Sequence, residues 1–184
     1  MTIRQYAART LTVLLLAGSQ VPTAAAWNED TWDQISGIGV YGLMGTALIL
    51  PSTRKDWEGL QQATYSIGSG AAITLTGKTL IDSERPDESD DDSFPSGHTT
   101  NAFSSATTLH RRYGWKTGVP AYAVATITGI ARERAREHHW YDVVAGAAIG
   151  TLTGWYFTDP INDKVQLVPW VDSTGGGVSI SMRW

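Results

Sequence analysis

The sequence predicts an all-α protein, a compact bundle of about five to six helices followed by a short C-terminal β-hairpin. Two observations lead to this fold class. Between residues 27 and 160, long apolar segments are separated by short loops rich in charged residues, glycine and proline. After residue 161, apolar and polar residues alternate, which is typical of half-buried strands. A chain of 184 residues is long enough for one such domain with its own core.

Residues 1–26 have the features of a secretory signal peptide. Arg4 and Arg9 give a positive start, residues 11–18 are a short apolar stretch, and residues 24–26 are three alanines suited to cleavage. The alternative, an uncleaved membrane anchor, is less favoured because the apolar stretch is too short to cross a bilayer comfortably. The sequence therefore predicts a periplasmic or secreted protein that begins at Trp27. It contains no cysteine, so no disulfide is expected there.

The helical domain is predicted to span residues 27–160. The first predicted helix is uncharged and carries glycines at 37, 39, 42 and 45, a spacing that suggests close helix packing, and Pro51 is expected to end it. Residues 87–92 form an acidic loop, and Asp159 with Pro160 closes the helical part. The five predicted helices are Ile35–Leu50, Asp56–Ile81, Ser96–Tyr113, Val119–Arg134 and Tyr141–Phe157.

The tail, residues 161–184, is predicted to form the hairpin. Two segments with strand character, 165–171 and 178–184, flank the turn sequence Thr174-Gly175-Gly176-Gly177. The hairpin could act as a lid, as an interface or as a cover over the edge of the bundle. The last of these is the favoured interpretation.

Three short segments carry residues suited to phosphate chemistry. Lys78 is followed after six residues by Arg85, the sequence Pro-Ser-Gly-His occupies 95–98, and Arg132 is followed by His138 and Asp142. A phosphoryl group in transit spreads negative charge over three oxygens, so catalysis depends on positioned cations. Arginine binds such oxygens with a planar fork, and lysine adds a point charge.

The sequence at 95–98 also predicts the start of a helix. Ser96 is a favourable N-cap residue, and the free backbone N–H groups of Gly97 and His98 would face an anion at the positive end of the helix. Gly97 has no side chain to keep a phosphate away from that backbone.

The two histidines need opposite protonation states, one neutral to attack phosphorus and one protonated to release the leaving oxygen. His138 and Asp142 are four residues apart and share a helix face, so the carboxylate can orient the imidazole. We therefore expect His138 to be the nucleophile and His98 the acid. His139 lacks a carboxylate at the equivalent spacing, because Val143 follows it.

These segments resemble the type 2 phosphatidic acid phosphatase superfamily, which includes class A acid phosphatases and vanadium haloperoxidases. Its pattern is K-x6-R-P, then P-S-G-H, then S-R-x5-H-x3-D, and only Ala131 departs from it. The resemblance runs from Lys78 to Phe157. It implies a metal-independent, cofactor-free phosphatase that hydrolyses phosphate monoesters or pyrophosphates on a lipid-like body. It also implies a phosphohistidine intermediate, with the two histidines in the roles given above.

Other functions stay open at this point. A membrane-embedded lipid phosphatase would use the same mechanism, a haloperoxidase would hold vanadate in the same pocket, and an inactive relative would only bind phosphate. The substitution at Ala131 is the one hint of inactivity. The chain has four histidines and no cluster of metal ligands, so no metal is expected. Its net charge of −4, without a basic stripe, argues against nucleic acid as a partner.

Membrane placement has arguments on both sides. Arg54 with Lys55, and Arg111 with Arg112 and Lys116, fall in alternate loops, as the positive-inside rule requires of a spanning protein with an outward-facing site. Against this, the apolar segments are roughly 14–18 residues long, short of the roughly 20 that a spanning helix needs. The helix that follows Ser96 is also rich in serine and threonine. The sequence therefore favours a soluble or peripherally bound enzyme, and it does not predict an oligomeric state.

Overall fold

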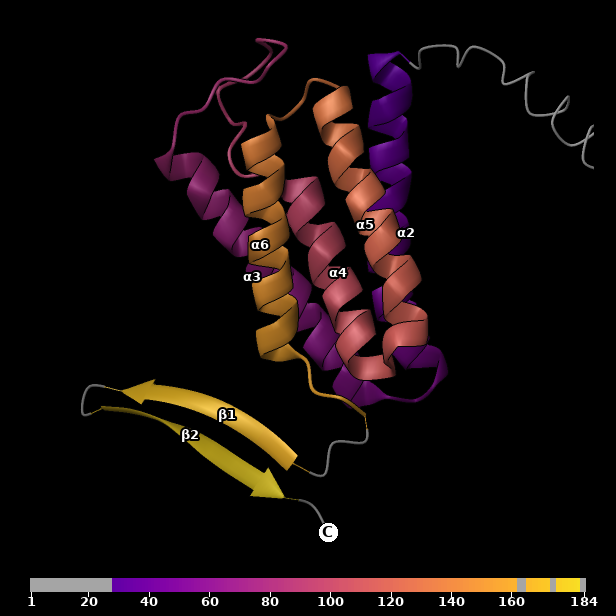
Figure 1. Ribbon diagram of the computed structural model, residues 1–184, viewed down its shortest axis with the longest axis vertical. Coiled ribbons are helices and arrows are strands. Elements are labelled where there is room, and N and C mark those ends of the chain that lie inside the picture. Colours follow the sequence, from indigo (N-terminus) through magenta and orange to yellow (C-terminus); the bar gives the residue numbers. More distant parts are fainter. Residues whose placement is uncertain (1–27, 162–164, 173–174, 183–184) are drawn as a thin grey trace, which may run out of the picture.

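The computed structural model describes residues 28–161, 165–172 and 175–182 (Figure 1). The signal peptide predicted for residues 1–26 lies outside these ranges, and so does the segment 162–164. Five helices form a bundle, in agreement with the predicted fold class. They are α2 (Glu29–Thr53), α3 (Trp57–Leu80), α4 (Gly97–Tyr113), α5 (Trp115–Arg134) and α6 (Trp140–Phe157).

The helix boundaries follow local chemistry. Asn28 and Asp56 accept hydrogen bonds from backbone N–H groups three residues later, at 2.9 and 3.0 Å, and so cap α2 and α3. Gly114 has a φ of 82°, which glycine adopts without strain, and it separates α4 from α5. Pro51 was expected to end the first helix, but α2 continues to Thr53, because the fixed φ of proline is compatible with the last helical turn.

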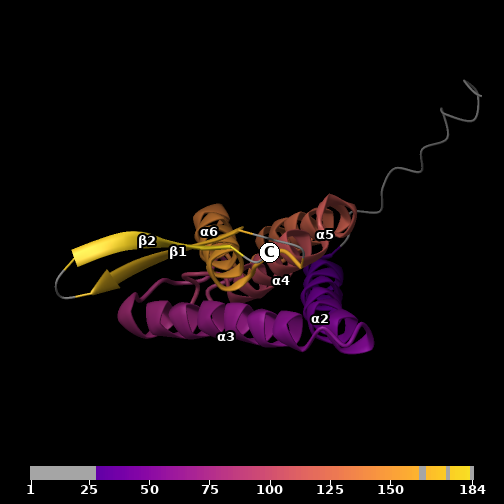
Figure 2. The same ribbon diagram turned by 90° about the horizontal axis from the view of Figure 1, so that it is seen from below.

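Helix α4 lies at the centre of the bundle and packs against each of the other four helices (Figures 1 and 2). Its closest neighbour is α6, which presents glycines 146, 150 and 154 to it. A Cβ atom at Gly146 would lie 2.6 Å from the carbonyl oxygen of Ser96, so the two helices could not approach this closely with larger residues. The prediction of close packing at the glycines of α2 was wrong for 37, 42 and 45, which face open space.

The interior of the bundle is unusually polar. The hydroxyl groups of Ser66 and Ser104 lie 2.7 Å apart, and Thr74 donates to Thr100 at 3.1 Å, so these buried hydroxyls are paired with one another across the α3–α4 contact. The serines and threonines of α4, which made this helix look too polar for a membrane, therefore point inward. The buried hydroxyl residues of this helix are Thr99, Thr100, Ser104, Ser105, Thr107 and Thr108.

The exterior is correspondingly apolar. Large aliphatic side chains project outward from the middle of the helices, and tryptophans are exposed towards both ends of the bundle. Within the described ranges, α2 is the one helix that passes a length-and-composition test for a membrane span. Exposed aliphatic residues include Ile38, Ile49, Ile73, Ile127, Ile130, Val144 and Leu152, and exposed tryptophans are Trp57, Trp115, Trp140 and Trp155.

Strands β1 (Val165–Asp172) and β2 (Gly175–Met182) pair antiparallel, with Val165 opposite Met182 and Asp172 opposite Gly175. The role predicted for the tail, a cover over the edge of the bundle, stays a prediction. The predicted boundary between the helical domain, residues 27–160, and the tail, residues 161–184, also stays a prediction.

Candidate active site

The three sequence segments meet at one end of the bundle, the upper end in Figure 1. Lys78 lies in the last turn of α3 and Arg85 in the loop that follows it. His98 lies in the first turn of α4, Arg132 in the last turn of α5, and His138 in the loop before α6. Successive helices run in opposite directions, so the α3–α4 and α5–α6 loops fall at the same end.

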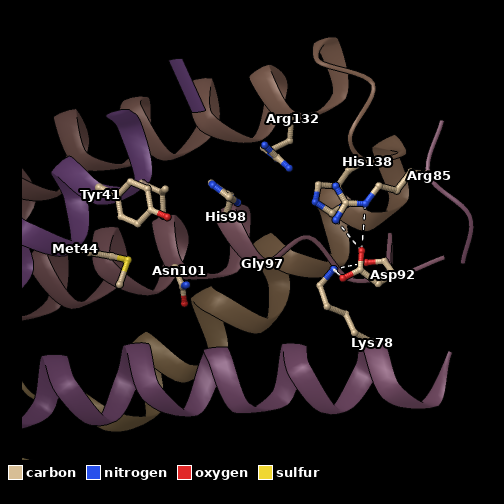
Figure 3. Close-up of a pocket in the computed structure, with 11 residues that line it drawn as sticks. Tyr41, Met44, Lys78, Arg85, Asp92, Gly97, His98, Asn101, Arg132 and His138 are labelled. Atoms are coloured by element: carbon tan, nitrogen blue, oxygen red, sulfur yellow. Dashed lines mark hydrogen bonds and ion pairs between the residues drawn. The ribbon is translucent and has the colours of Figure 1, made fainter. Parts of the chain in front are cut away.

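These residues line a single cavity of about 340 Å³. Six of the eight predicted site residues contribute to its wall, while Ser96 and Asp142 are fully buried behind it. Figure 3 shows the cations at one side of His98, and Tyr41 and Met44 at the other. The lining residues are Val40, Tyr41, Met44, Lys78, Arg85, Asp92, Gly97, His98, Asn101, Arg132 and His138.

His138 is held in one tautomer by a backbone contact. Its Nδ1 lies 2.7 Å from the carbonyl oxygen of Ser93, and a carbonyl oxygen can only accept a hydrogen bond. Nδ1 therefore carries the proton and Nε2 keeps its lone pair. The imidazole is 2 % exposed, so its orientation is fixed by the surrounding protein. This is the form that a histidine nucleophile requires.

Asp142 supports this arrangement less directly than expected. Its Oδ2 lies 3.9 Å from Nδ1 of His138, beyond hydrogen-bond distance, and it accepts instead from the hydroxyl of Ser93 at 2.6 Å and from the backbone of His139 at 2.8 Å. Its carbonyl accepts from the backbone N–H of Ser96 at 3.1 Å. Asp142 thus connects the loop of His138 to the start of α4. No sequence motif marks Ser93, which contributes its main-chain carbonyl to His138 and its hydroxyl to Asp142.

The surroundings keep His138 neutral. Burial and the nearby positive charges of Arg132, Lys78 and Arg85 lower its pKa to about 3. The imidazole is therefore uncharged at neutral pH, and its free Nε2 is available as a base or a nucleophile.

Each of the three pocket cations is paired with a carboxylate. Lys78 and Arg85 both contact Asp92, at 3.2 and 2.7 Å, and Arg85 also contacts Glu137. Glu137 in turn lies 3.0 Å from Arg132. Arg132 makes a further ion pair with Asp33 of α2. These carboxylates balance cations that would otherwise be partly buried without a counter-charge.

Sequence reasoning did not identify these three carboxylates as pocket groups. Asp92 was noted only as one member of the acidic loop, and it alone among them lines the cavity. Although burial opposes the shift, hydrogen bonds from Arg85 and Lys78 lower the pKa of Asp92, so this side chain is an anion in the pocket. Glu137 is one of the variable residues of the third motif, directly before His138, and Asp33 lies outside the three motifs, so the motif pattern marks neither carboxylate.

The start of α4 differs in one detail from the prediction. Ser96 occupies the N-cap position, but its hydroxyl pairs with that of Thr99 at 2.9 Å instead of with a backbone N–H. The first N–H groups of α4 have no acceptor within the helix, and Gly97 opens onto the cavity. Ala131, the one departure from the family pattern, is buried and does not line the cavity.

Two features of the wall are not explained by phosphate binding. Val40, Tyr41 and Met44 of α2 form an apolar side next to His98, and the ring of Tyr41 lies 6.2 Å from the imidazole of His98. The buried Oδ1 of Asn101 has no hydrogen-bond partner among the described residues. No group of three metal-ligating side chains occurs in the part of the chain that the structure describes.

With this geometry established, comparison with known proteins identifies the family. The family model of the PAP2 superfamily matches residues 59–165, which include all three motifs. The chain belongs to the PAP2 superfamily. The resemblance seen in the sequence is thereby confirmed.

Two curated relatives are lipid A phosphatases. A lipid A 1-phosphatase of Porphyromonas gingivalis is 37% identical over 117 residues, which cover 58% of this chain and 26% of that protein. A lipid A 4'-phosphatase of Helicobacter pylori is 31% identical over 101 residues, covering 50% of this chain and 49% of the relative. The chain therefore spans half or less of the length of these relatives.

Two solved structures share the fold of this PAP2 protein. Aquifex aeolicus LpxE superposes with a TM-score of 0.61 at 23% identity, covering 70% of this chain and 84% of that one. A transmembrane PAP2-type phosphatidylglycerolphosphate phosphatase from Bacillus subtilis gives 0.58 at 23% identity, covering 80% and 91%. At this identity the likeness concerns the fold alone.

Proposed function

We propose that this protein is a membrane-embedded phosphatase that removes a phosphate monoester or pyrophosphate group from a lipid. One observation carries the proposal. A neutral, oriented histidine, a second histidine and three cations converge on one cavity, and Val40, Tyr41 and Met44 form an apolar side of it. The curated relatives are lipid A phosphatases, which agrees with a phosphorylated lipid as the class of substrate.

In the first step, Nε2 of His138 attacks the phosphorus atom and the bond between phosphorus and the leaving oxygen breaks. His98 gives its proton to that oxygen, so the lipid departs as an alcohol or as a phosphate. Lys78, Arg85 and Arg132 bind the non-bridging oxygens, together with the N–H groups at the start of α4. The bound phosphate itself favours the protonated form of His98 that this step requires.

In the second step, water attacks the phosphohistidine. His98, now neutral, accepts a proton from that water, the phosphorus–nitrogen bond breaks, and inorganic phosphate leaves with His138 restored. No metal ion or cofactor takes part in this scheme. Lys78, Arg85 and Arg132 stabilise the charge of the phosphoryl group in both steps.

The apolar side of the cavity suggests how the lipid body is held. Val40, Tyr41 and Met44 would contact the part of the substrate next to the phosphate, and Asn101 could accept a hydrogen bond from a hydroxyl or amide group there. These contacts favour a phosphate on a large body with an apolar portion over a small, highly charged ester.

The distribution of polar and apolar side chains supports placement in the membrane. Many hydroxyl groups lie inside the bundle beside an apolar cluster that includes Leu43, Ile67 and Leu109, while many other isoleucine, valine and leucine side chains face outward, where a water-soluble helical protein places mostly polar residues. Exposed tryptophans near the helix ends match an interfacial belt. Arg54, Lys55, Arg111 and Lys116 lie at the end opposite the site, which by the positive-inside rule supports a cytoplasmic location for that end and a periplasmic location for the active site.

Phosphate release from the full chain in detergent micelles would test the proposal. The substrates would be a lipid phosphomonoester and the matching methyl phosphodiester. We expect turnover of the monoester only, and a loss of roughly 10³-fold or more in His138→Ala. Activity in a chelator should equal activity without it.

The adjacent histidine provides a matched control. His139 does not line the cavity, so His139→Ala should retain activity within a few-fold. Equal loss in His138→Ala and His139→Ala, or full activity in His138→Ala, would overturn the assignment. Release of phosphate from soluble esters but from no lipid would show that the substrate class is wrong.

A further inference from the structure

A second concave surface lies at the end of the bundle opposite the active site. It is a cavity of about 470 Å³ between the end of α2 and the start of α5, and we call it the α2/α5 groove. Its volume is within the range of about 300–1,000 Å³ that is typical of small-molecule sites. Its lining residues are Leu43, Thr46, Leu50, Arg54, Leu109, Lys116, Thr117, Pro120, Ala121 and Val124.

The groove is amphipathic along its length. Leu43 and Leu109 form an apolar floor with Val124 on the side nearer the bundle centre, whereas Arg54 and Lys116 stand where α2 ends and α5 begins. Both cations are held near aromatic rings. The guanidinium of Arg54 lies 4.9 Å from the ring centroid of Tyr113, and the ammonium of Lys116 lies 5.9 Å from that of Trp115.

Neither cation of the groove has a carboxylate partner among the residues the structure describes. This distinguishes them from Lys78, Arg85 and Arg132 in the active site, each of which makes an ion pair. The groove lining itself contains no acidic residue. Two uncompensated positive charges at the mouth of an apolar channel are complementary to an anionic amphiphile.

Two other grooves in the bundle lack this combination. One between α5 and α6 has a single charged residue in its lining, Glu133, and one between α3 and α6 has none. Their lining gives no basis for choosing an occupant. The charge of the α2/α5 groove does give such a basis.

We infer that the α2/α5 groove binds an anionic phospholipid of the bilayer, with its phosphodiester headgroup between Arg54 and Lys116 and an acyl chain along Leu43, Leu109 and Val124. The inference rests on the membrane placement proposed above. A phosphodiester at this position is far from His138 and is not a substrate. The lipid would fill the space between α2, which contributes Val40 and Tyr41 to the active site, and α5, which contributes Arg132.

The test uses the full chain in detergent micelles, titrated with phosphatidylglycerol or phosphatidylcholine and observed by native mass spectrometry. The wild type should retain phosphatidylglycerol on the order of tenfold more strongly than phosphatidylcholine. Arg54→Gln combined with Lys116→Gln should abolish this preference. Lys55→Gln combined with Arg111→Gln removes the same charge at the same end without touching the groove lining, and should reduce the preference less than threefold.

Val124→Trp supplies an independent variant, because it fills the apolar part and leaves both cations in place. It should weaken retention of both lipids. Equal effects of the two double variants would show that surface charge alone is responsible, and an unchanged preference in Arg54→Gln/Lys116→Gln would refute the site. Phosphate release is measured on the same samples. A protein that turns over a lipid phosphate but shows no groove-dependent lipid retention refutes this inference and leaves the proposed function intact.

Discussion

The two ends of the bundle use the same residue types in opposite ways. At the active-site end, Lys78, Arg85 and Arg132 are largely buried and each is paired with a carboxylate. At the other end, Arg54 and Lys116 are exposed and unpaired within the described ranges. A buried cation needs a counter-charge while no phosphate is bound, whereas an exposed one is solvated or meets a lipid headgroup.

One cation at the end opposite the active site differs from Arg54 and Lys116. Arg112 is buried, and it is paired with Asp56 at 2.5 Å, with the hydroxyl of Tyr113 also bonded to that carboxylate. Pairing therefore follows burial, not position. The difference between the ends is that the pairs around the active site open onto a cavity where a substrate anion can replace the carboxylate. The Asp56 pair is enclosed by protein.

The largest expected contrast is between one arginine from each end. Arg85→Gln removes a fork that would bind the transferring phosphoryl group, and should lower kcat/KM for a lipid phosphomonoester by roughly 10³-fold. Arg111→Gln, at the opposite end of the bundle, should change kcat/KM by less than threefold. Steady-state phosphate release in micelles measures both. Comparable losses in the two variants would mean that the two ends are not functionally distinct.

The next largest effect concerns stability. Asp56→Asn leaves Arg112 buried without its counter-charge, which should reduce the free energy of unfolding by about 3 kcal/mol. Glu58→Gln removes an exposed carboxylate 3.4 Å from the same arginine, and should cost under about 1 kcal/mol. Chemical denaturation in mild detergent measures both values. Equal losses would contradict the claim that burial decides the strength of these pairs.

The same pair has a defined pH dependence. Hydrogen bonds from Arg112 lower the pKa of Asp56 to about 2. Because the folded pKa is below the unfolded value near 3.9, the stabilisation is complete above about pH 4 and is lost as the pH falls towards 2. The difference in stability between wild type and Asp56→Asn should therefore shrink over that interval, which repeated denaturation curves would detect.

A smaller effect is expected for a carboxylate at the active-site end. Asp92 is ion-paired with Lys78 and Arg85, the cations that would bind phosphate. Asp92→Asn should therefore lower the inhibition constant of inorganic phosphate by on the order of tenfold. Asp91→Asn removes the same charge from the same loop, where Asp91 makes no ion pair among the described residues, and should have less than a twofold effect. If both variants behave alike, the loop acts only through its overall charge.

The sequence predicted the all-α class and the positions of the helices because their apolar segments are long and their ends carry capping residues. It also predicted six residues that line one cavity, because the three motifs have fixed spacing, and their binding of phosphate stays a prediction. The sequence favoured a soluble or peripherally bound protein over the membrane placement proposed above. The serines and threonines of α4 made that helix look water-soluble, and only the packing reveals that these hydroxyls are buried against α3 and α6.

The other features that the sequence did not predict also depend on how the chain packs. Contacts such as the one between His138 and the carbonyl of Ser93 depend on backbone atoms that every residue has, so no sequence pattern marks them. The counter-ions Asp33 and Glu137 are brought to Arg132 by the packing of α2 and the turn after α5. The close-packed glycines 146, 150 and 154 of α6 were not singled out from the sequence, because glycine spacing alone does not show which face of a helix meets a neighbour, and 37, 42 and 45 of α2 face open space.

Detection of a covalent phosphohistidine would test the central claim most directly. The full chain in micelles would be mixed with a lipid carrying a labelled phosphomonoester, quenched rapidly under alkaline conditions and mapped by peptide mass spectrometry. We predict label on His138 in the wild type and none in His138→Ala, with more label accumulating in a variant whose second step is slowed. Turnover without label on His138, or label on another residue, would contradict this mechanism.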